Sequence, residues 1–195
     1  MDPTNREPEL SINLGPLRLK NPVMAASGTF GYGEEYGGIV PLGALGAIIT
    51  KGLSLTPCRG NPPPRLAETS AGLLNAIGLE NMGLEIFCKE KLPFLRQVPC
   101  PVLVNIFGRT VDEYAELGAR IGSLEGISGI EINVSCPNMK KGGVIFAAEP
   151  KPVYQVVSKV RRRATSSFIM ALPLWLLVSS PSKTSSFFSS SFIFP

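Results

Sequence analysis

The sequence contains no histidine among its 195 residues, so the commonest acid–base side chain and metal ligand of proteins is missing. Any proton transfer must therefore be carried out by cysteine, lysine, tyrosine or a carboxyl group. The four cysteines, Cys58, Cys88, Cys100 and Cys136, form no C-x-x-C pair. This excludes the usual zinc and iron–sulfur motifs and a disulfide framework. We expect no metal site and a reducing, cytoplasmic environment.

Charged residues are also few, and the formal net charge of +4 comes partly from Arg161, Arg162 and Arg163. No aromatic residues interleave with a basic face, so nucleic acid is not an expected partner. The first residues are polar and contain proline, unlike a signal segment. The apolar run of residues 168–178 is interrupted by Pro173 and is shorter than the roughly 20 residues that span a bilayer. We expect no membrane attachment.

Two compositional gaps divide the chain. All twenty glycines lie between Gly15 and Gly143, and no acidic residue follows Glu149. Beyond residue 164 the sequence becomes rich in serine and phenylalanine. We expect residues 1–164 to form the N-terminal part of an enzyme domain. We expect residues 165–195 to be an aberrant tail, caused by a frameshift or a truncated gene, that is not native to the fold.

Short apolar segments alternate with segments of helical periodicity in the first part of the chain. The expected buried strands are residues 22–26, 46–50, 101–106 and 129–134. The expected helices are residues 83–95, 111–124 and 152–162. In the second helix Tyr114, Leu117 and Ile121 share a face, and Thr110 or Asp112 is the expected cap. Continuous apolar strands that alternate with helices are typical of a parallel α/β sheet.

Each expected strand ends in a small or polar residue, in chain order Ser27, Lys51, Asn105 and Cys136. The last strand leads into Asn133, Cys136 and Asn138, because Pro137 cannot extend a strand ladder. Polar residues at successive strand ends favour a (β/α)8 barrel over a doubly wound sheet, since a barrel builds its site at that end. No G-x-G-x-x-G sequence follows any of the strands, so a dinucleotide site is not indicated.

Six segments in order carry a resemblance to dihydroorotate dehydrogenase, the flavin enzyme of pyrimidine biosynthesis. They are residues 21–28, 49–52, 60–65, 75–79, 104–106 and 133–138, which read NPVMAASG, ITKG, GNPPPR, NAIGL, VNI and NVSCPN. The likeness extends from about residue 10 to residue 163. It is strongest for class 1B, whose catalytic chain is soluble, because residues 31–36 and 67–69 resemble that class. Segment 60–65 is assigned no chemistry and is interpreted as a rigid loop.

The resemblance implies an incomplete (β/α)8 TIM barrel of roughly the first four to five β/α units, with FMN as cofactor. It implies oxidation of dihydroorotate to orotate, in which Cys136 removes a proton from C5 while a hydride leaves C6 for the flavin. A thiol can serve as base once its thiolate is favoured. The implied FMN-binding residues are Ser27, Lys51, Gly52, Asn105 and Asn133. The implied substrate-binding residues are Lys51, Asn75, Ala76, Ile77, Gly78, Leu79, Asn133 and Asn138.

The resemblance to class 1B also implies a partner, an electron-transfer subunit that carries FAD and an iron–sulfur cluster. A homodimer or a heterotetramer is expected for the full-length form. A further flavin-contacting lysine is expected in the fifth strand, but residues 168–173 contain none. Strands six to eight are also missing, so we expect that the 195-residue chain neither closes a barrel nor binds FMN tightly. Electron transfer to NAD through the partner or to fumarate is left open.

Two alternatives remain open. The first is a dihydropyrimidine dehydrogenase-like flavoprotein that acts on uracil or thymine, in which the position of Asn138 is usually histidine. The second is an inactive truncated product that binds nothing. Flavin absorbance would separate the second alternative from the two enzymes, and competition between pyrimidines would separate the enzymes from each other.

Overall fold

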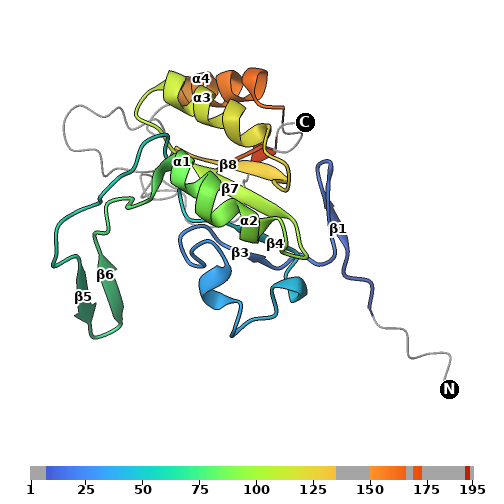
Figure 1. Ribbon diagram of the computed structural model, residues 1–195, viewed down its shortest axis with the longest axis horizontal. Coiled ribbons are helices and arrows are strands. Elements are labelled where there is room, and N and C mark those ends of the chain that lie inside the picture. The colour runs from blue at the N-terminus through green and yellow to red at the C-terminus, as the bar shows by residue number, and fades with distance from the viewer. Residues whose placement is uncertain (1–7, 135–149, 166–168, 173–191, 194–195) are drawn as a thin grey trace, which may run out of the picture.

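The computed structural model describes residues 8–134, 150–165, 169–172 and 192–193 (Figure 1). Its main element is a six-stranded sheet with the strand order β10-β9-β8-β7-β4-β3. The parallel strands are β3 (Met24–Ala25), β4 (Ala47–Ile49), β7 (Val102–Ile106), β8 (Gly129–Asn133) and β9 (Ile169–Leu172). The short β10 (Phe192–Ile193) is antiparallel to β9. The four strands expected from the apolar runs and the parallel α/β sheet are confirmed.

The order of the parallel strands follows the chain. From β3 to β9 each strand lies beside the next parallel strand in sequence, and the order never reverses. A doubly wound sheet reverses its order at a switch point, whereas the strands of a (β/α)8 barrel succeed one another around the axis. The sheet therefore has the arrangement of the first strands of a barrel. β9 and β10 come from residues beyond 164, and the division of the chain at that position stays a prediction.

Helices cover one side of this sheet (Figure 1). A continuous helical segment consists of α1 (Gly83–Ile86), the π-helical η3 (Phe87–Lys91) and α2 (Leu92–Leu95), in agreement with the expected helix 83–95. α3 (Val111–Gly122) is capped by Thr110, whose hydroxyl oxygen accepts a 3.1 Å hydrogen bond from the Glu113 N–H. α4 (Pro150–Arg163) packs beside α3. Both later helices were expected from their periodicity.

Several small elements lie outside the expected set. Short 3-10 turns, η1 (Glu34–Tyr36) and η2 (Leu42–Ala44), follow β3. β1 (Ile12–Leu14) and β2 (Leu17–Leu19) form an antiparallel hairpin at the start of the described chain. β5 (Leu66–Thr69) and β6 (Gly72–Asn75) form a second hairpin, which projects away from the sheet (Figure 1). Neither hairpin was predicted from the sequence.

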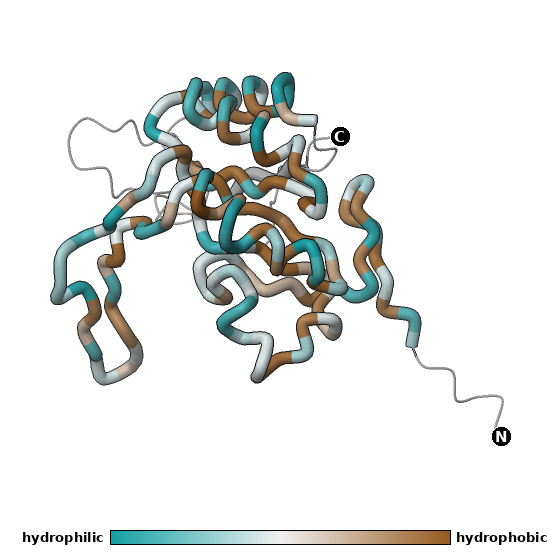
Figure 2. Tube along the Cα trace, in the orientation of Figure 1, coloured by the Kyte–Doolittle hydropathy of each residue, from teal (hydrophilic) through white to brown (hydrophobic). Residues whose placement is uncertain are grey.

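The main core lies between the sheet and the helices, where Figure 2 shows apolar residues gathered along the strands and the inner helix faces. Tyr114, Leu117 and Ile121 of α3 are all buried there, as the helical spacing predicted. Gly118 lets α3 approach α4 closely, because a Cβ atom at this position would lie 2.7 Å from Cγ1 of Val160. The helix pair therefore depends on a residue without a side chain at this contact.

The opposite side of the sheet changes in polarity along the strands. A second apolar cluster, in which Ala47, Ile49 and Leu103 pack with Leu19 of the β1–β2 hairpin, lies on this side. Toward the carboxyl ends of β7 and β8 the same side carries Asn105 and Glu131 instead, and both are buried. Since side chains alternate along a strand, these polar groups share one face. The fold thus places its polar groups at the end where a barrel builds its site.

Candidate active site at the carboxyl ends of the strands

A cavity of about 870 Å³ lies at this polar end of the sheet. Its volume falls within the roughly 300–1,000 Å³ that is usual for small-molecule sites. Nine residues predicted for the site line it, namely Ser27, Lys51, Gly52, Asn75, Ile77, Gly78, Leu79, Asn105 and Asn133. The structure brings these side chains together from segments that are more than 100 residues apart in sequence. The cavity residues that were not predicted are Gly28, Thr29, Gly31, Tyr32, Glu35, Tyr36, Arg65 and Glu80.

Of the three remaining predicted residues, only Ala76 lies in the described part of the chain, and it does not line the cavity. Ala76 lies in the same loop as its predicted neighbours, but its main chain faces residues 61 and 65 through hydrogen bonds. Cys136 and Asn138 lie outside the described residues, so their roles stay predictions. The segment that contains both begins directly after β8, which ends at Asn133 on the cavity wall.

Asn105 and Glu131 occupy adjacent positions below the cavity. They are register partners on β7 and β8, and the Asn105 Nδ2 group donates a hydrogen bond to Glu131 Oε1. Glu131 is 0% exposed, and its Oε2 has no hydrogen-bond partner among the described residues. Burial raises the pKa of Glu131, while the Ser27 hydroxyl and the Asn105 amide oppose this shift. Sequence reasoning missed Glu131, although a carboxylate between Ile130 and Ile132 on a buried strand was a signal.

The loop after β3 forms a second wall of the cavity. Gly28 and Gly31 adopt positive φ angles of 78° and 52°, which glycine does at little cost. The Lys51 N–H donates a 2.7 Å hydrogen bond to the Gly31 carbonyl, and this joins the loop to the end of β4. The Tyr32 N–H donates to Glu35 Oε2 at 3.0 Å. Burial and the Glu35 charge together raise the pKa of Tyr32 to about 12, so its hydroxyl stays protonated at neutral pH.

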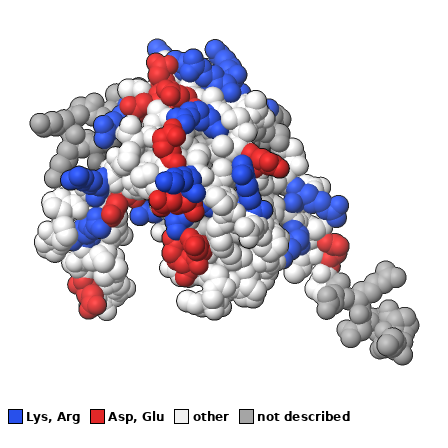
Figure 3. All heavy atoms as spheres, in the orientation of Figure 1, with Lys and Arg blue, Asp and Glu red and all other residues white. Residues whose placement is uncertain are grey.

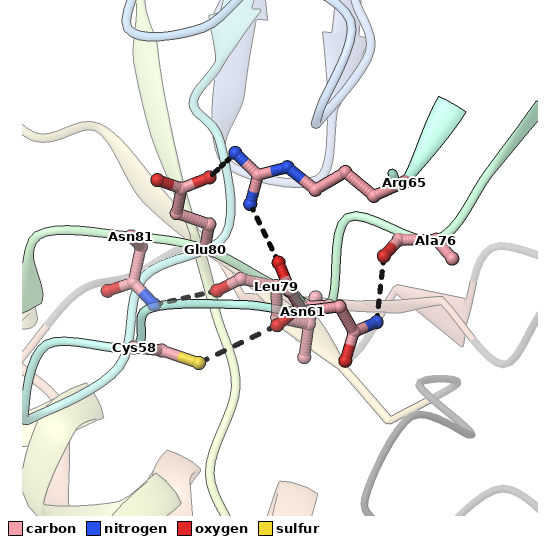
Figure 4. Close-up of polar contacts among 8 residues, drawn as sticks. Cys58, Asn61, Arg65, Ala76, Leu79, Glu80 and Asn81 are labelled. Atoms are coloured by element: carbon pink, nitrogen blue, oxygen red, sulfur yellow. Dashed lines mark hydrogen bonds and ion pairs between the residues drawn. The ribbon is translucent and has the colours of Figure 1, made fainter. Parts of the chain in front are cut away.

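A third wall is the loop of residues 75–81, which Figure 4 shows in contact with residues 58–65. Asn61 donates from its backbone N–H to the Ile77 carbonyl at 3.0 Å and from Nδ2 to the Ala76 carbonyl at 2.7 Å. The Cys58 thiol lies 3.6 Å from the Gly78 carbonyl, to which it donates. Segment 60–65, interpreted as a rigid loop without chemistry, therefore holds the main chain of the predicted substrate loop.

Backbone conformation confirms that this loop is held by its surroundings. Leu79 has a φ of 57°, which is unfavourable for a residue with a side chain. Asn81 fixes it, because its Nδ2 donates to the Leu79 carbonyl at 3.0 Å. At Gly78, whose φ is 77°, a Cβ atom would lie 2.8 Å from the backbone nitrogen of Asn61. The loop can therefore approach residues 58–65 only with glycine at this position.

Charges of both signs surround the cavity. Lys51 and Arg65 bring positive charge, and Arg65 pairs with Glu80 at 2.6 Å on the cavity lining (Figure 4). On the face drawn in Figure 3, Lys and Arg are likewise interspersed with Asp and Glu. Such a mixed distribution differs from the one-sign surface that steers polyanions. On the cavity lining, Lys51 lies together with the carboxamides of Asn75, Asn105 and Asn133.

These groups suit a planar ligand with ring N–H and C=O groups, because carboxamides both donate and accept hydrogen bonds. Gly28 and Gly52 leave backbone exposed at the cavity wall, which permits a flat ring to lie close. A Cβ atom at Gly52 would lie 2.9 Å from Asn105 Oδ1 and 3.3 Å from Phe107 Cδ1. A side chain at position 52 would therefore displace the carboxamide. The residues present thus fit a flavin ring.

Within the part of the chain that the structure describes, no helix is long and apolar enough to cross a membrane. The cytoplasmic setting expected from the composition stays a prediction.

Known proteins include several that are similar to this chain. A family model described as dihydroorotate dehydrogenase matches residues 9–178. A relative from Geobacter metallireducens, named "Dihydroorotate dehydrogenase B (NAD(+)), catalytic subunit", is 53% identical over 167 residues, which are 86% of this chain and 55% of that protein. The protein of the same name from Geobacter sulfurreducens has the same identity and coverage. The chain thus spans about half the length of the curated relatives that it matches.

A solved structure shares the fold. It is a crystal structure of DHODH in complex with ferulenol from Eimeria tenella, with a TM-score of 0.64 and 23% sequence identity. The match covers 83% of this chain and 46% of that one. This likeness supports the fold class, a parallel α/β sheet that forms part of a (β/α)8 barrel. With the family model covering most of its residues, the chain belongs to the dihydroorotate dehydrogenase family.

Proposed function

We propose that this chain is the catalytic part of an FMN-dependent oxidoreductase that converts dihydroorotate to orotate in pyrimidine biosynthesis. The observation that carries the proposal is the meeting of Lys51, Asn75, Asn105 and Asn133 in one cavity. They come from the ends of β4, β6, β7 and β8 and lie within the residues that the family model matches. Lys51, Asn105 and Asn133 lie at the carboxyl end of the six-stranded sheet, and the separate β5–β6 hairpin brings Asn75 to the same cavity.

FMN would be held by Ser27, Lys51, Gly52, Asn105 and Asn133. When bound, it supplies the acceptor for the hydride that leaves the substrate. Gly52 leaves room for the ring, and Asn105 and Asn133 supply carboxamides for its polar edge. The Lys51 ammonium group offsets negative charge on the cofactor or the substrate. Its position at the end of β4 is fixed by the 2.7 Å hydrogen bond of its N–H to Gly31.

The substrate would lie between Lys51, the loop 75–79 and the residues that follow β8. Dihydroorotate carries a carboxylate, which the Lys51 ammonium group can bind. Its ring N–H and C=O groups would pair with the carboxamides of Asn75, Asn133 and Asn138. Of these, Asn75 ends β6 and is positioned by the register of the β5–β6 hairpin, where it pairs with Leu66. The hydrogen bonds from Asn61 and Asn81 keep the rest of the loop in place.

Cys136 would act as the general base that takes the proton from C5. It follows Asn133 by three residues in sequence and belongs to the matched segment 133–138. A positioned base contributes roughly 10²–10⁴-fold to a rate. A thiol serves in this role as its thiolate, which a positive charge close to the sulfur favours.

The electron acceptor of the reduced protein would be a separate subunit that carries FAD and an iron–sulfur cluster. Support comes from the relatives, which are named catalytic subunits of a B-type enzyme with NAD(+). The sequence itself has no dinucleotide fingerprint and no clustered cysteines. We propose that the full-length form assembles as a homodimer or as a heterotetramer with that partner.

The test is stopped-flow reduction by dihydroorotate of the flavin bound to the full-length form. Cys136→Ala should slow reduction by roughly 10²–10⁴-fold and leave the FMN content unchanged. Cys100→Ala is the matched control, because Cys100 precedes β7 at the end of the sheet away from the cavity and should not affect the rate. Reduction of the Cys136→Ala protein within a few-fold of wild type would exclude this base. Bleaching by dihydrouracil instead of dihydroorotate would favour the uracil-type alternative, and a full-length form purified without flavin would refute the proposal.

A further inference from the structure

The buried carboxyl group of Glu131 has no role in the function proposed above. It is 0% exposed and lies on β8, between β7 and β9. Its Oε1 accepts a hydrogen bond from Asn105 Nδ2, and the Ser27 hydroxyl also acts on the carboxyl group, but Oε2 has no hydrogen-bond partner among the described residues. Burying a carboxyl group costs free energy unless its oxygens are paired, and an apolar residue of similar size is often more stabilising. Stability therefore does not explain a glutamate at this position.

The hydrogen bond between Glu131 and Asn105 determines how the Asn105 side chain is oriented. A carboxamide has an oxygen and an amino group of nearly the same size, so shape alone does not decide which one faces the cavity. Oε1 of Glu131 accepts the hydrogen bond from Asn105 Nδ2. The amino group therefore faces β8, and the carbonyl oxygen Oδ1 is turned away from it.

Oδ1 is directed toward Gly52, a residue of the cavity wall. A Cβ atom on Gly52 would lie 2.9 Å from this oxygen, so Oδ1 occupies the space beside Gly52 that a side chain would otherwise fill. The main chain of Asn105 is fixed as well, because its carbonyl accepts a 2.9 Å hydrogen bond from the Leu53 N–H. With the backbone and the amino group both held, Asn105 presents a hydrogen-bond acceptor at the cavity.

We propose that Glu131 is a positioning residue, whose buried carboxyl group orients the Asn105 carboxamide so that Oδ1 accepts a hydrogen bond from a ring N–H of the bound ligand. The identity of that ligand as FMN rests on the proposed function. A ligand that placed a hydrogen-bond acceptor next to Oδ1 would bind less well, because two acceptors cannot form a hydrogen bond with each other. Glu131 thus contributes to the selection of the ligand without contacting it.

The first test needs no ligand. In nitrogen–proton correlation spectra of the purified protein, the Asn105 side-chain amide should give two resolved protons that exchange slowly with water. Glu131→Met removes the acceptor at nearly constant length and should make this exchange at least tenfold faster. Glu131→Gln keeps a carbonyl acceptor and should restore slow exchange. Glu68→Gln, at an exposed glutamate of strand β5, is the control and should change nothing.

The second test measures FMN affinity by quenching of flavin fluorescence. Glu131→Met and Asn105→Ala should each weaken FMN binding about tenfold, as expected for one lost hydrogen bond. Combined in one protein, they should weaken it no more than Asn105→Ala alone, because Glu131 acts through Asn105. If Glu131 had only a structural role, the two losses of FMN affinity would multiply, and the double variant would bind FMN about a hundredfold more weakly.

The outcomes separate this inference from the proposed function. Slow amide exchange that depends on Glu131, in a protein that does not bind FMN, would support the orientation of Asn105 and refute the cofactor. FMN binding with multiplying losses would support the cofactor and refute the positioning role. If Glu131→Met does not fold, Glu131→Ala replaces it. Rapid exchange of the Asn105 amide in the wild-type protein would by itself overturn the inference.

Discussion

Replacing Asn81 with alanine would test whether side-chain hydrogen bonds hold the cavity loop in its conformation. Asn81 is 7% exposed, and its Oδ1 accepts from the Gly83 N–H at 2.9 Å and from the Ser54 N–H at 3.2 Å. Its Nδ2 donates to the Leu79 carbonyl at 3.0 Å. The side chain therefore pairs three backbone groups from three different positions in the chain.

The magnitude follows from what alanine would leave unpaired. The Gly83 bond is buried and the other two are partly buried. A buried donor or acceptor without a partner costs about 1–3 kcal/mol, so the free energy of unfolding should fall by about 3 kcal/mol. The left-handed conformation of Leu79 adds about 1–2 kcal/mol of strain that the loop could then release by moving. Orotate affinity should therefore fall along with stability.

Urea unfolding followed by far-ultraviolet circular dichroism measures the free energy of unfolding, and titration of the flavin spectrum with orotate measures the affinity. Asn13→Ala is the matched control, because Asn13 is exposed on β1, and its loss should stay within about 0.5 kcal/mol. A loss below about 1 kcal/mol for Asn81→Ala would show that water or relaxation replaces these bonds. Asn81 would then not be what holds the loop of residues 75–81 in its conformation.

Three further predictions concern the helices and the buried carboxyl group. Thr110→Ala should lower the free energy of unfolding by about 1 kcal/mol and Thr110→Ser by much less, because serine keeps the cap of α3. Gly118→Ala should lower the free energy of unfolding, measured in urea, by about 1 kcal/mol. The new methyl group would be overpacked against Val160 at a cost of about 1–3 kcal/mol, which exceeds the gain in helix propensity of about 1 kcal/mol. A more stable variant would contradict this prediction. Burial raises the pKa of Glu131 above 4.5, so the carboxyl group keeps its proton to a higher pH in the folded state than in the unfolded chain. The free energy of unfolding should therefore fall as the pH rises from about 4.5 to the raised pKa. Glu131→Gln should remove that part of the slope, and an unchanged slope would show that Glu131 titrates normally.

The sequence by itself was sufficient for the parallel sheet and its helices. Strands 46–50, 101–106 and 129–134 were visible as apolar runs because their central residues are buried on both faces. The buried face of α3 and its cap at Thr110 were predicted because helical spacing and capping act over three or four residues. The strand-end residues Ser27, Lys51, Asn105 and Asn133 were found for a related reason, since each follows or ends such a run.

Only the tertiary structure decided how the cavity is held. The Asn61 hydrogen bond to Ala76 joins residues 15 apart, and the bond between Asn105 and Glu131 joins residues 26 apart. Such pairs depend on the path of the β5–β6 hairpin and on the register of β7 against β8. Local periodicity contains no information on register, because a strand pattern is the same in every alignment with its neighbour. Residues 58–65 and Glu131 could therefore be assigned a place in the site only after the chain was folded.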